Sequence, residues 1–209
     1  MYRLLFIFIL LISWSNNIFS QELKNRFIEV YGEEETGRFF LKTNEGNPNI
    51  TGDNNVNILN GETPFTSFIT ILIDGKSYKI DKKSKFTKKI HRTNNTLEME
   101  VKLPFNIRLI QIVKIIKNSY TGRKDALLVD FRIKNLDRVA HNVKLRFVAD
   151  TALDNKRNFI YQLVDGRKIN SETDFRRGIP SLIKLIDNYK KPALRAFFRF
   201  KETYSSKPY

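Results

Sequence analysis

Apolar and polar residues alternate strictly along three segments of this 209-residue chain, and this period of two constrains the fold more than any other feature. The segments are Thr96–Leu103, Ala126–Asn135 and Val143–Ala149. Successive side chains of a β-strand point to opposite faces, so the pattern predicts strands with one buried and one solvated face. Helical periodicity is scarce and no β–α alternation is present. We therefore predict an all-β protein, an antiparallel β-sandwich, and not a parallel sheet.

Turn-forming residues separate the expected strands at short spacing. Asp74-Gly75 lies between two runs of strand-forming residues and predicts a tight hairpin. Asp165-Gly166 separates a second pair of runs in the same way. Thr43–Glu62 is rich in Asn, Gly, Pro and Asp, so we expect a long loop there. The one helical candidate is Ser181–Asn188, about two turns that begin just after Pro180.

The N-terminal segment has the order of a secretory signal peptide. A positive start precedes nine unbroken apolar residues, Leu4–Ile12, and the small residue Ser20 lies just before Gln21. Nine apolar residues form about 14 Å of helix, roughly half a bilayer, so a permanent transmembrane helix fits poorly. We predict a signal peptide over residues 1–20, and one β-sandwich domain over 21–209 in the periplasm or outside a bacterial cell. An uncleaved anchor or a buried N-terminal strand is the alternative.

The residues with reactive side chains do not form a recognisable catalytic motif. The chain has no cysteine, which removes disulfides and thiolate chemistry. Its two histidines, His91 and His141, are too few for a zinc site, and both read as exposed polar side chains. We predict no catalytic residue, no metal and no cofactor. The leading interpretation is a non-enzymatic protein that acts by binding or assembly.

Positive charge is concentrated after the first third of the chain. The formal net charge is +15, from 37 Lys and Arg against 22 Asp and Glu. The densest basic run, residues 76–92, contains Lys79, Lys82, Lys83, Lys85, Lys88, Lys89 and Arg92. A solvated loop with lysines on strand edges is the simpler interpretation, and a surface for cell wall or anionic lipid is the alternative. Nucleic acid is not expected, because no nucleic-acid-binding motif is present.

A group of oxygen-bearing residues follows the third alternating segment. It consists of Asp150, Thr151, Asp154 and Asp165. Carboxylates gathered in a loop could bind calcium or act on a sugar, so a carbohydrate-facing module or a degenerate hydrolase-like sandwich is a second interpretation. The simpler interpretation is structural, because Asp in a turn usually closes it and a buried Asp150 requires a partner.

The C-terminal segment Ala193–Lys201 predicts one more strand. Phe198 and Phe200 lie on one face of it and Phe197 on the other. An open strand edge beside exposed Phe is a template for pairing with another chain. We therefore expect the protein to self-associate or to be completed by another periplasmic protein, and a glycan such as peptidoglycan is a further candidate partner.

Several short sequence motifs are spread over most of the chain that follows the expected signal peptide. They are T-G-R-F at Thr36–Phe39, P-F-T-S at Pro64–Ser67, I-D-G at Ile73–Gly75 and L-R-F-V-A-D-T at Leu145–Thr151. Together they resemble an uncharacterised group of exported bacterial β-sandwich proteins. The resemblance implies a large sandwich of the kind found in sugar-processing superfamilies, with no activity established for the group. It also implies that this chain is shortened at its C-terminal end.

Overall fold

The computed structural model describes residues 20–33, 36–45, 52–59, 67–81, 83–151, 159–171, 173, 175, 180–186 and 195–199. The expected signal peptide, apart from Ser20, lies outside the described residues. The described ranges contain fourteen strands and no helix, and every strand pair is antiparallel. This confirms the predicted all-β, sandwich-like fold.

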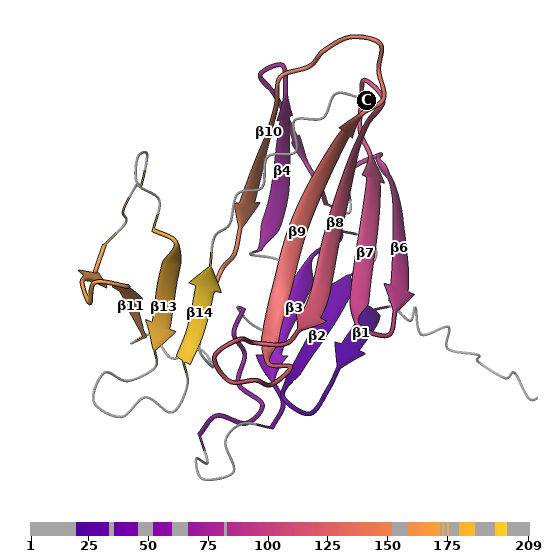
Figure 1. Ribbon diagram of the computed structural model, residues 1–209. Coiled ribbons are helices and arrows are strands. Elements are labelled where there is room, and N and C mark those ends of the chain that lie inside the picture. The colour runs from indigo at the N-terminus through magenta and orange to yellow at the C-terminus, as the bar shows by residue number, and fades with distance from the viewer. Residues whose placement is uncertain are drawn as a thin grey trace, which may run out of the picture.

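The largest layer is a four-stranded sheet, which we call the front sheet (Figure 1). Its strands follow one another in space as in sequence: β6 (Thr87–Thr93), β7 (Thr96–Lys102), β8 (Ile107–Ile116) and β9 (Ala126–Asn135). Two of the three alternating segments are thus β7 and β9. The apolar residues of β7 are buried and the polar ones half-buried or exposed, as the period of two requires.

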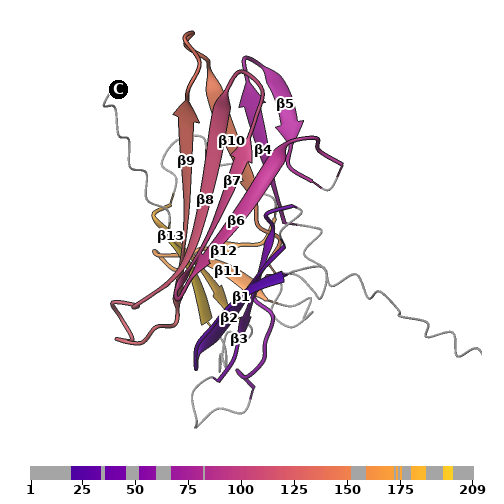
Figure 2. The ribbon, with the colours of Figure 1, turned by 90° about the vertical axis from the view of Figure 1, so that its right-hand side faces the viewer.

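Two smaller sheets lie behind the front sheet and cover the same face of it (Figure 2). The upper back sheet has the order β10 (Val143–Val148), β4 (Phe68–Ile73) and β5 (Lys76–Lys79). The lower back sheet has the order β1 (Ser20–Lys24), β2 (Ile28–Glu33) and β3 (Phe39–Thr43). Ile71 of the upper sheet packs with Met99 and Leu109, while Val30 of the lower sheet packs with Leu97 and Val113.

A fourth sheet lies beside the lower half of the sandwich. Its order is β12 (Lys168–Ile169), β11 (Ile160–Leu163), β13 (Leu182–Ile186) and β14 (Arg195–Arg199). Leu185, Ala196 and Phe198 of this sheet pack against Val56 and Ile58. The predicted turn between β11 and β12 is present, with Gly166 at φ +89.

The predicted helix at Ser181–Asn188 is wrong. Its described part is strand β13, which pairs with β11 on one side and β14 on the other. The run Leu182–Ile186 is too short for the packed face of a helix, and four of its five residues are apolar, as in a strand between two neighbours. Pro180 therefore precedes a strand and not a first helical turn.

The predicted long loop at Thr43–Glu62 is also only partly correct. Thr43 is the last residue of β3, and in the described stretch 52–59 the side chains of Val56, Ile58 and Leu59 are buried. This stretch runs beside β3, since Asn57 forms a bridge with Lys42. Because most residues of this segment are polar, its composition does not reveal that these three apolar side chains attach the segment to the core. Asn44 and Glu45 follow β3 and donate backbone hydrogen bonds to Phe27 and Arg26, whereas residues 46–51 and 60–62 lie outside the described residues.

The predicted hairpin at Asp74-Gly75 is confirmed. Asp74 has φ +48 and Gly75 has φ +82, and positive φ at both central residues is typical of the tight turn that joins twisted antiparallel strands. Register places Ile73 opposite Lys76 directly across the turn. The turn geometry and the register together fix the position of this turn, which lies at the upper end of the sandwich.

Gly37 allows the lower back sheet to approach the front sheet closely. Its φ is +66, and a Cβ on it would lie 1.5 Å from the sulfur of Met99. We expect Gly37→Ala to lower the free energy of unfolding in two ways. Left-handed backbone costs about 1–2 kcal/mol in any residue but Gly, and overpacking against Met99 adds roughly 1–3 kcal/mol.

The matched control for this prediction is Gly122→Ala. Gly122 has nearly the same φ, +68, but a Cβ there would meet nothing within 4 Å. Denaturant unfolding of both variants separates the two contributions. Equal losses of stability in the two variants would show that contact with Met99 contributes nothing.

Candidate functional site

The residues of the predicted carboxylate loop have separate structural contacts. The backbone N–H of Asp150 donates to Ser67 Oγ at 3.1 Å, and the Thr151 hydroxyl bonds the Tyr161 hydroxyl. Asp165 lies in the β11–β12 turn and accepts hydrogen bonds from the backbone N–H and the guanidinium of Arg167, which lower its pKa. Asp165 thus closes its own hairpin, and Asp154 lies outside the described residues.

The predicted basic run is divided between two edge strands of different layers. Lys79 belongs to β5, and its ammonium lies 4.8 Å from the centre of the Phe68 ring. Lys88 belongs to β6 and donates to the backbone carbonyl of Asp81 at 2.6 Å. The side chains of Lys83, Lys85 and Arg92 are exposed, while Lys82 and the side chain of Lys89 lie outside the description.

The C-terminal phenylalanines of the predicted interaction edge are also separated. Phe198 points into the cluster formed with Val56 and Leu185, whereas Phe197 is 55% exposed on the opposite face of β14. Phe200 lies outside the described residues. Of the strands that the structure describes, β14 is the last of its sheet.

Three connections meet at the upper end of the sandwich, and we call this end the tip (Figures 1 and 2). They are the β4–β5 turn at 74–75, the β7–β8 turn at 103–106 and the β9–β10 loop at 136–142. Asp74 and Asn142 exchange two hydrogen bonds of 2.9 Å, one of them through the Asp74 carboxylate. Leu136 and Asn106 exchange two more, of 3.2 and 2.9 Å. Each turn is thereby fixed to the β9–β10 loop.

His141 joins these connections through both of its ring nitrogens. Nδ1 lies 2.6 Å from Asp74 Oδ2, and Nε2 lies 3.2 Å from Asp137 Oδ2. The ring packs against Phe105, with centroids 5.0 Å apart, and the side chain is only 8% exposed. The interpretation of His141 as an exposed polar residue is therefore wrong: Asp74 comes from a segment 67 residues away, and Asp137 comes from the same loop, four residues before His141.

The two carboxylates favour the protonated imidazole, in which both nitrogens donate. The hydrogen bond to Asp74, followed by the one to Asp137, raises the pKa of His141 above 6.5. In turn His141 lowers the pKa of both aspartates below 3.8, with help from the backbone N–H groups of Asn142 and Arg138. Neither nitrogen is free to act as a general base or a metal ligand. His141, Asp74 and Asp137 thus connect the β4–β5 turn to the β9–β10 loop, and we call this cluster the latch.

The tip exposes apolar side chains on the loops that the latch connects. Phe105 is 47% exposed, Leu136 44% and Val139 62%. Phe105 also has φ +58, a left-handed conformation that is costly for a bulky residue. The Asn135 side chain donates to the Val139 carbonyl at 2.8 Å, which holds the loop in shape. These exposed apolar side chains on ordered loops make the tip a candidate contact surface.

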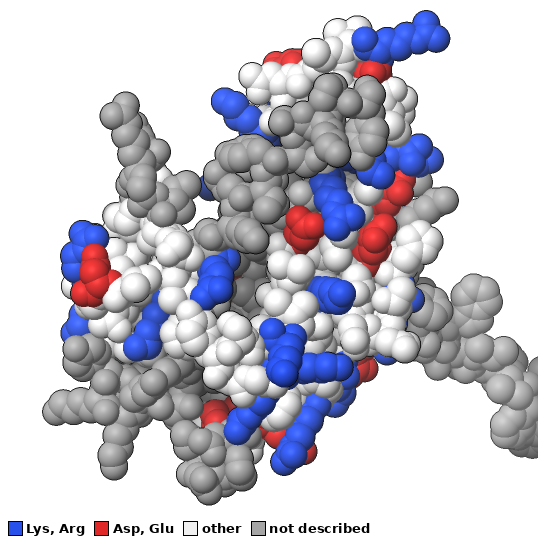
Figure 3. Space-filling view, in the orientation of Figure 1, with Lys and Arg blue, Asp and Glu red and all other residues white. Residues whose placement is uncertain are grey.

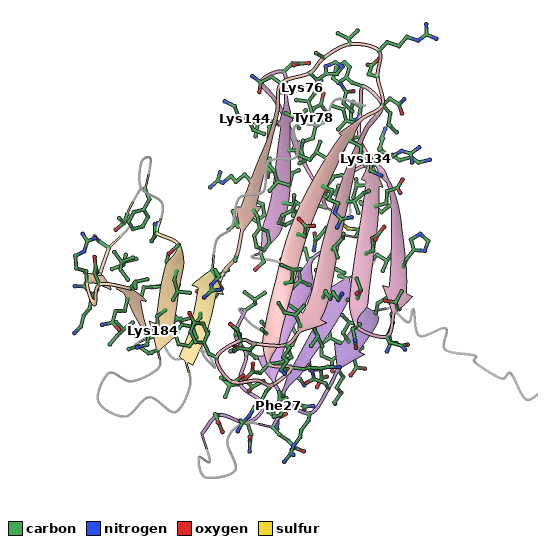
Figure 4. All side chains as sticks on the ribbon, viewed as in Figure 1. Phe27, Lys76, Tyr78, Lys134, Lys144 and Lys184 are labelled. Carbon is green, nitrogen blue, oxygen red and sulfur yellow. The ribbon has the colours of Figure 1, made fainter. Side chains whose placement is uncertain are left out.

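Cations surround the apolar residues of the tip. The exposed ones are Lys76, Lys134, Arg138 and Lys144, three of which are labelled at the upper end in Figure 4. The nearby carboxylates of Asp74 and Asp137 are both bound to His141. By contrast, charges of both signs are mixed over the outer face of the front sheet (Figure 3), where Arg132 binds Asp130 and Arg108 binds Glu100. The tip is therefore an apolar patch with a positive rim.

A void of about 10 Å³ between the front and lower back sheets is lined by residues that include Gly37, Met99 and Gln111. Such a volume holds one water molecule at most. Among the described residues, no group of three or more His, Cys, Asp or Glu side chains is arranged to hold a metal ion.

Comparison of the chain with protein-family models, with curated proteins and with solved structures gives no match. Within the described ranges, no helix has the length and apolar character needed to cross a membrane.

We expect His141→Gln to destabilise the protein in a pH-dependent manner. Because the pKa of His141 is raised, its stabilising contribution is complete below pH 6.5 and is lost as the pH rises through the folded value. The contribution of the two aspartates is lost only in acid, as the pH falls through their lowered pKa values. Thermal unfolding should show a larger difference from the wild type near pH 5–6 than near pH 9.

The control variant is His91→Gln, because His91 is exposed on β6. Its melting temperature should follow that of the wild type across this range. A loss of stability in His141→Gln that is equal at both pH values would contradict the latch.

Proposed function

We propose that the protein is a non-enzymatic binding protein that docks on an anionic lipid surface through its tip. The observation that carries this proposal is the combination, at one end of the sandwich, of exposed Phe105, Leu136 and Val139 on fixed loops with a rim of exposed Lys and Arg side chains. Aliphatic and aromatic side chains enter the boundary between headgroups and acyl chains, while Lys and Arg remain at the phosphates.

The latch supports this role because it fixes the tip before contact. His141, Asp74 and Asn142 hold the β9–β10 loop to the β4–β5 turn. A surface that is already ordered loses little conformational entropy on binding. The left-handed backbone of Phe105 is unfavourable for a bulky residue, and in this proposal it is retained because it places an aromatic ring at the tip.

Two other interpretations account less well for these side chains. A sugar-binding surface relies on flat aromatic rings, whereas the tip is mainly aliphatic apart from Phe105. A protein partner that adds a strand would use the strand edges, and the exposed apolar residues of the tip lie on turns. Export, predicted from the N-terminal segment, would place the protein where membrane surfaces are present.

We expect the purified protein to bind phosphatidylcholine vesicles more tightly when phosphatidylglycerol is included. The double variant Leu136→Ser/Val139→Ser should reduce the bound fraction about tenfold or more, because each side chain that leaves water contributes on the order of 1 kcal/mol or more. Arg138→Gln should reduce the free energy of vesicle binding by about 1 kcal/mol, and at high salt the variant and the wild type should bind equally. Vesicle co-sedimentation measures all three.

Val164→Ser provides the matched control, since Val164 is 70% exposed on the β11–β12 turn, remote from the tip. It should bind vesicles as the wild type does. Equal binding to both vesicle types, or equal losses in Val164→Ser and the double variant, would remove the proposed function.

A further inference from the structure

A second charged surface lies at the opposite end of the sandwich from the tip. There the β8–β9 loop, residues 117–125, meets the β1–β2 turn and strand β14 (Figure 1). The Asn25 side chain donates to the backbone carbonyl of Lys124 at 2.7 Å. The Arg199 guanidinium donates to the Tyr120 hydroxyl at 2.8 Å. Three segments distant in sequence thus form one continuous surface, which we call the basic band.

Aromatic rings in the basic band are exposed or lie under guanidinium groups. Tyr120 is 79% exposed, and the Arg199 guanidinium lies 5.5 Å from its ring centre. Phe27 has the Arg123 guanidinium at 5.5 Å and that of Arg26 at 6.0 Å. These are cation–π distances, so the cations and the rings hold one another in place.

The β14 side of the basic band adds a third ring and another cation. Phe197, which is 55% exposed, lies directly opposite Lys184 on the neighbouring strand, so the two side chains share a face. Arg199 is two residues from Phe197 and points to the same face. The labelled positions of Lys184 and Phe27 in Figure 4 mark the two sides of this surface.

The loop that presents Tyr120 is held in shape by its own hydrogen bonds. The backbone N–H of Asn118 donates to the Arg123 carbonyl at 2.7 Å, and that of Gly122 donates to the Asn118 carbonyl at 2.9 Å. The Asn118 side chain accepts from the backbone N–H of Tyr120 at 2.9 Å. Tyr120 and Arg123 are therefore presented by an ordered loop.

Positive charge exceeds negative charge over this surface. Its cations are Arg26, Lys117, Arg123, Lys124, Lys184 and Arg199. Its carboxylates have partners: Glu45 binds Arg26 at 2.7 Å, and Asp125 accepts from the Thr121 hydroxyl. Lys and Arg side chains gather beside the lower ends of β8 and β9 in Figure 3. A ligand that neutralises this surface must carry several negative charges along its length.

We propose that the basic band binds an acidic polysaccharide, a chain of sugar rings that carry carboxylate groups. Sugar rings would lie against Tyr120 and Phe197, since the flat apolar faces of the two fit each other. Carboxylates would pair with Arg123 and Arg199, whose planar guanidinium groups match a carboxylate in two hydrogen bonds. Both ends expose cations, but the exposed apolar side chains of the band are aromatic, whereas those of the tip are aliphatic apart from Phe105, so the two ends would select different ligands.

Affinity electrophoresis of the full protein through polygalacturonate, with neutral dextran as reference, tests this inference. We expect retardation by polygalacturonate alone, with an affinity that falls as salt is raised. Tyr120→Ala should weaken binding about tenfold, and Arg123→Gln about fivefold. Both side chains are exposed, and unchanged melting temperatures will verify that the variants fold.

Two comparisons make the result specific. Arg132→Gln is the control for Arg123→Gln, because Arg132 is an exposed arginine that already binds Asp130 on the front sheet. It should bind polygalacturonate as the wild type does, and so should the tip variant Leu136→Ser/Val139→Ser, whatever its behaviour with vesicles. Equal losses in Arg132→Gln and Arg123→Gln would overturn the proposal. Single-stranded DNA that binds more tightly than polygalacturonate and responds to Tyr120→Ala would also overturn it, in favour of nucleic acid.

Discussion

The inward face of the β7–β8 pair is the constraint on which the other parts of the structure depend. Leu97 and Val113 of this pair pack against the lower back sheet, while Met99, Val101 and Leu109 pack against the upper one. Burial of each such side chain contributes roughly 1.5–3 kcal/mol. Two separate three-stranded sheets thereby use one four-stranded sheet as their common partner, and the order of the layers follows from this.

This packing also determines where the loops come together. The front sheet and the upper back sheet end at the same level, so the Asp74-Gly75 turn reaches the β9–β10 loop at Asn142. Once the backbones meet, one imidazole can bind a carboxylate from each segment, and His141 does so with Asp74 and Asp137. The latch therefore forms because the two sheets pack together. It also stabilises that packing, since it connects the upper ends of both layers.

The sequence could predict the elements governed by local periodicity, but not those governed by contacts between distant segments. Alternation identified β7 and β9, and Asp74-Gly75 identified its hairpin, because side-chain direction and turn geometry depend on neighbouring residues. The sequence prediction of a helix at β13 is wrong because a short apolar run has no distinct period, and pairing with two neighbouring strands determines its conformation. The contact of His141 with Asp74 could not be predicted, since 67 residues separate them, whereas Asp137 is only four residues from His141.

Strand β9 connects the two proposed surfaces and sets the distance between them. Its first residue, Ala126, follows the loop of the basic band, and its last, Asn135, precedes the loop of the tip. Ten residues of extended strand span about 33 Å, which is several times the Debye length of roughly 8 Å at physiological ionic strength. Charges at one end are therefore screened from charges at the other, so a ligand bound at one end would not repel or attract a ligand at the opposite end electrostatically. A protein held to a lipid surface by its tip would present the basic band away from that surface, where an extended acidic polymer can reach it.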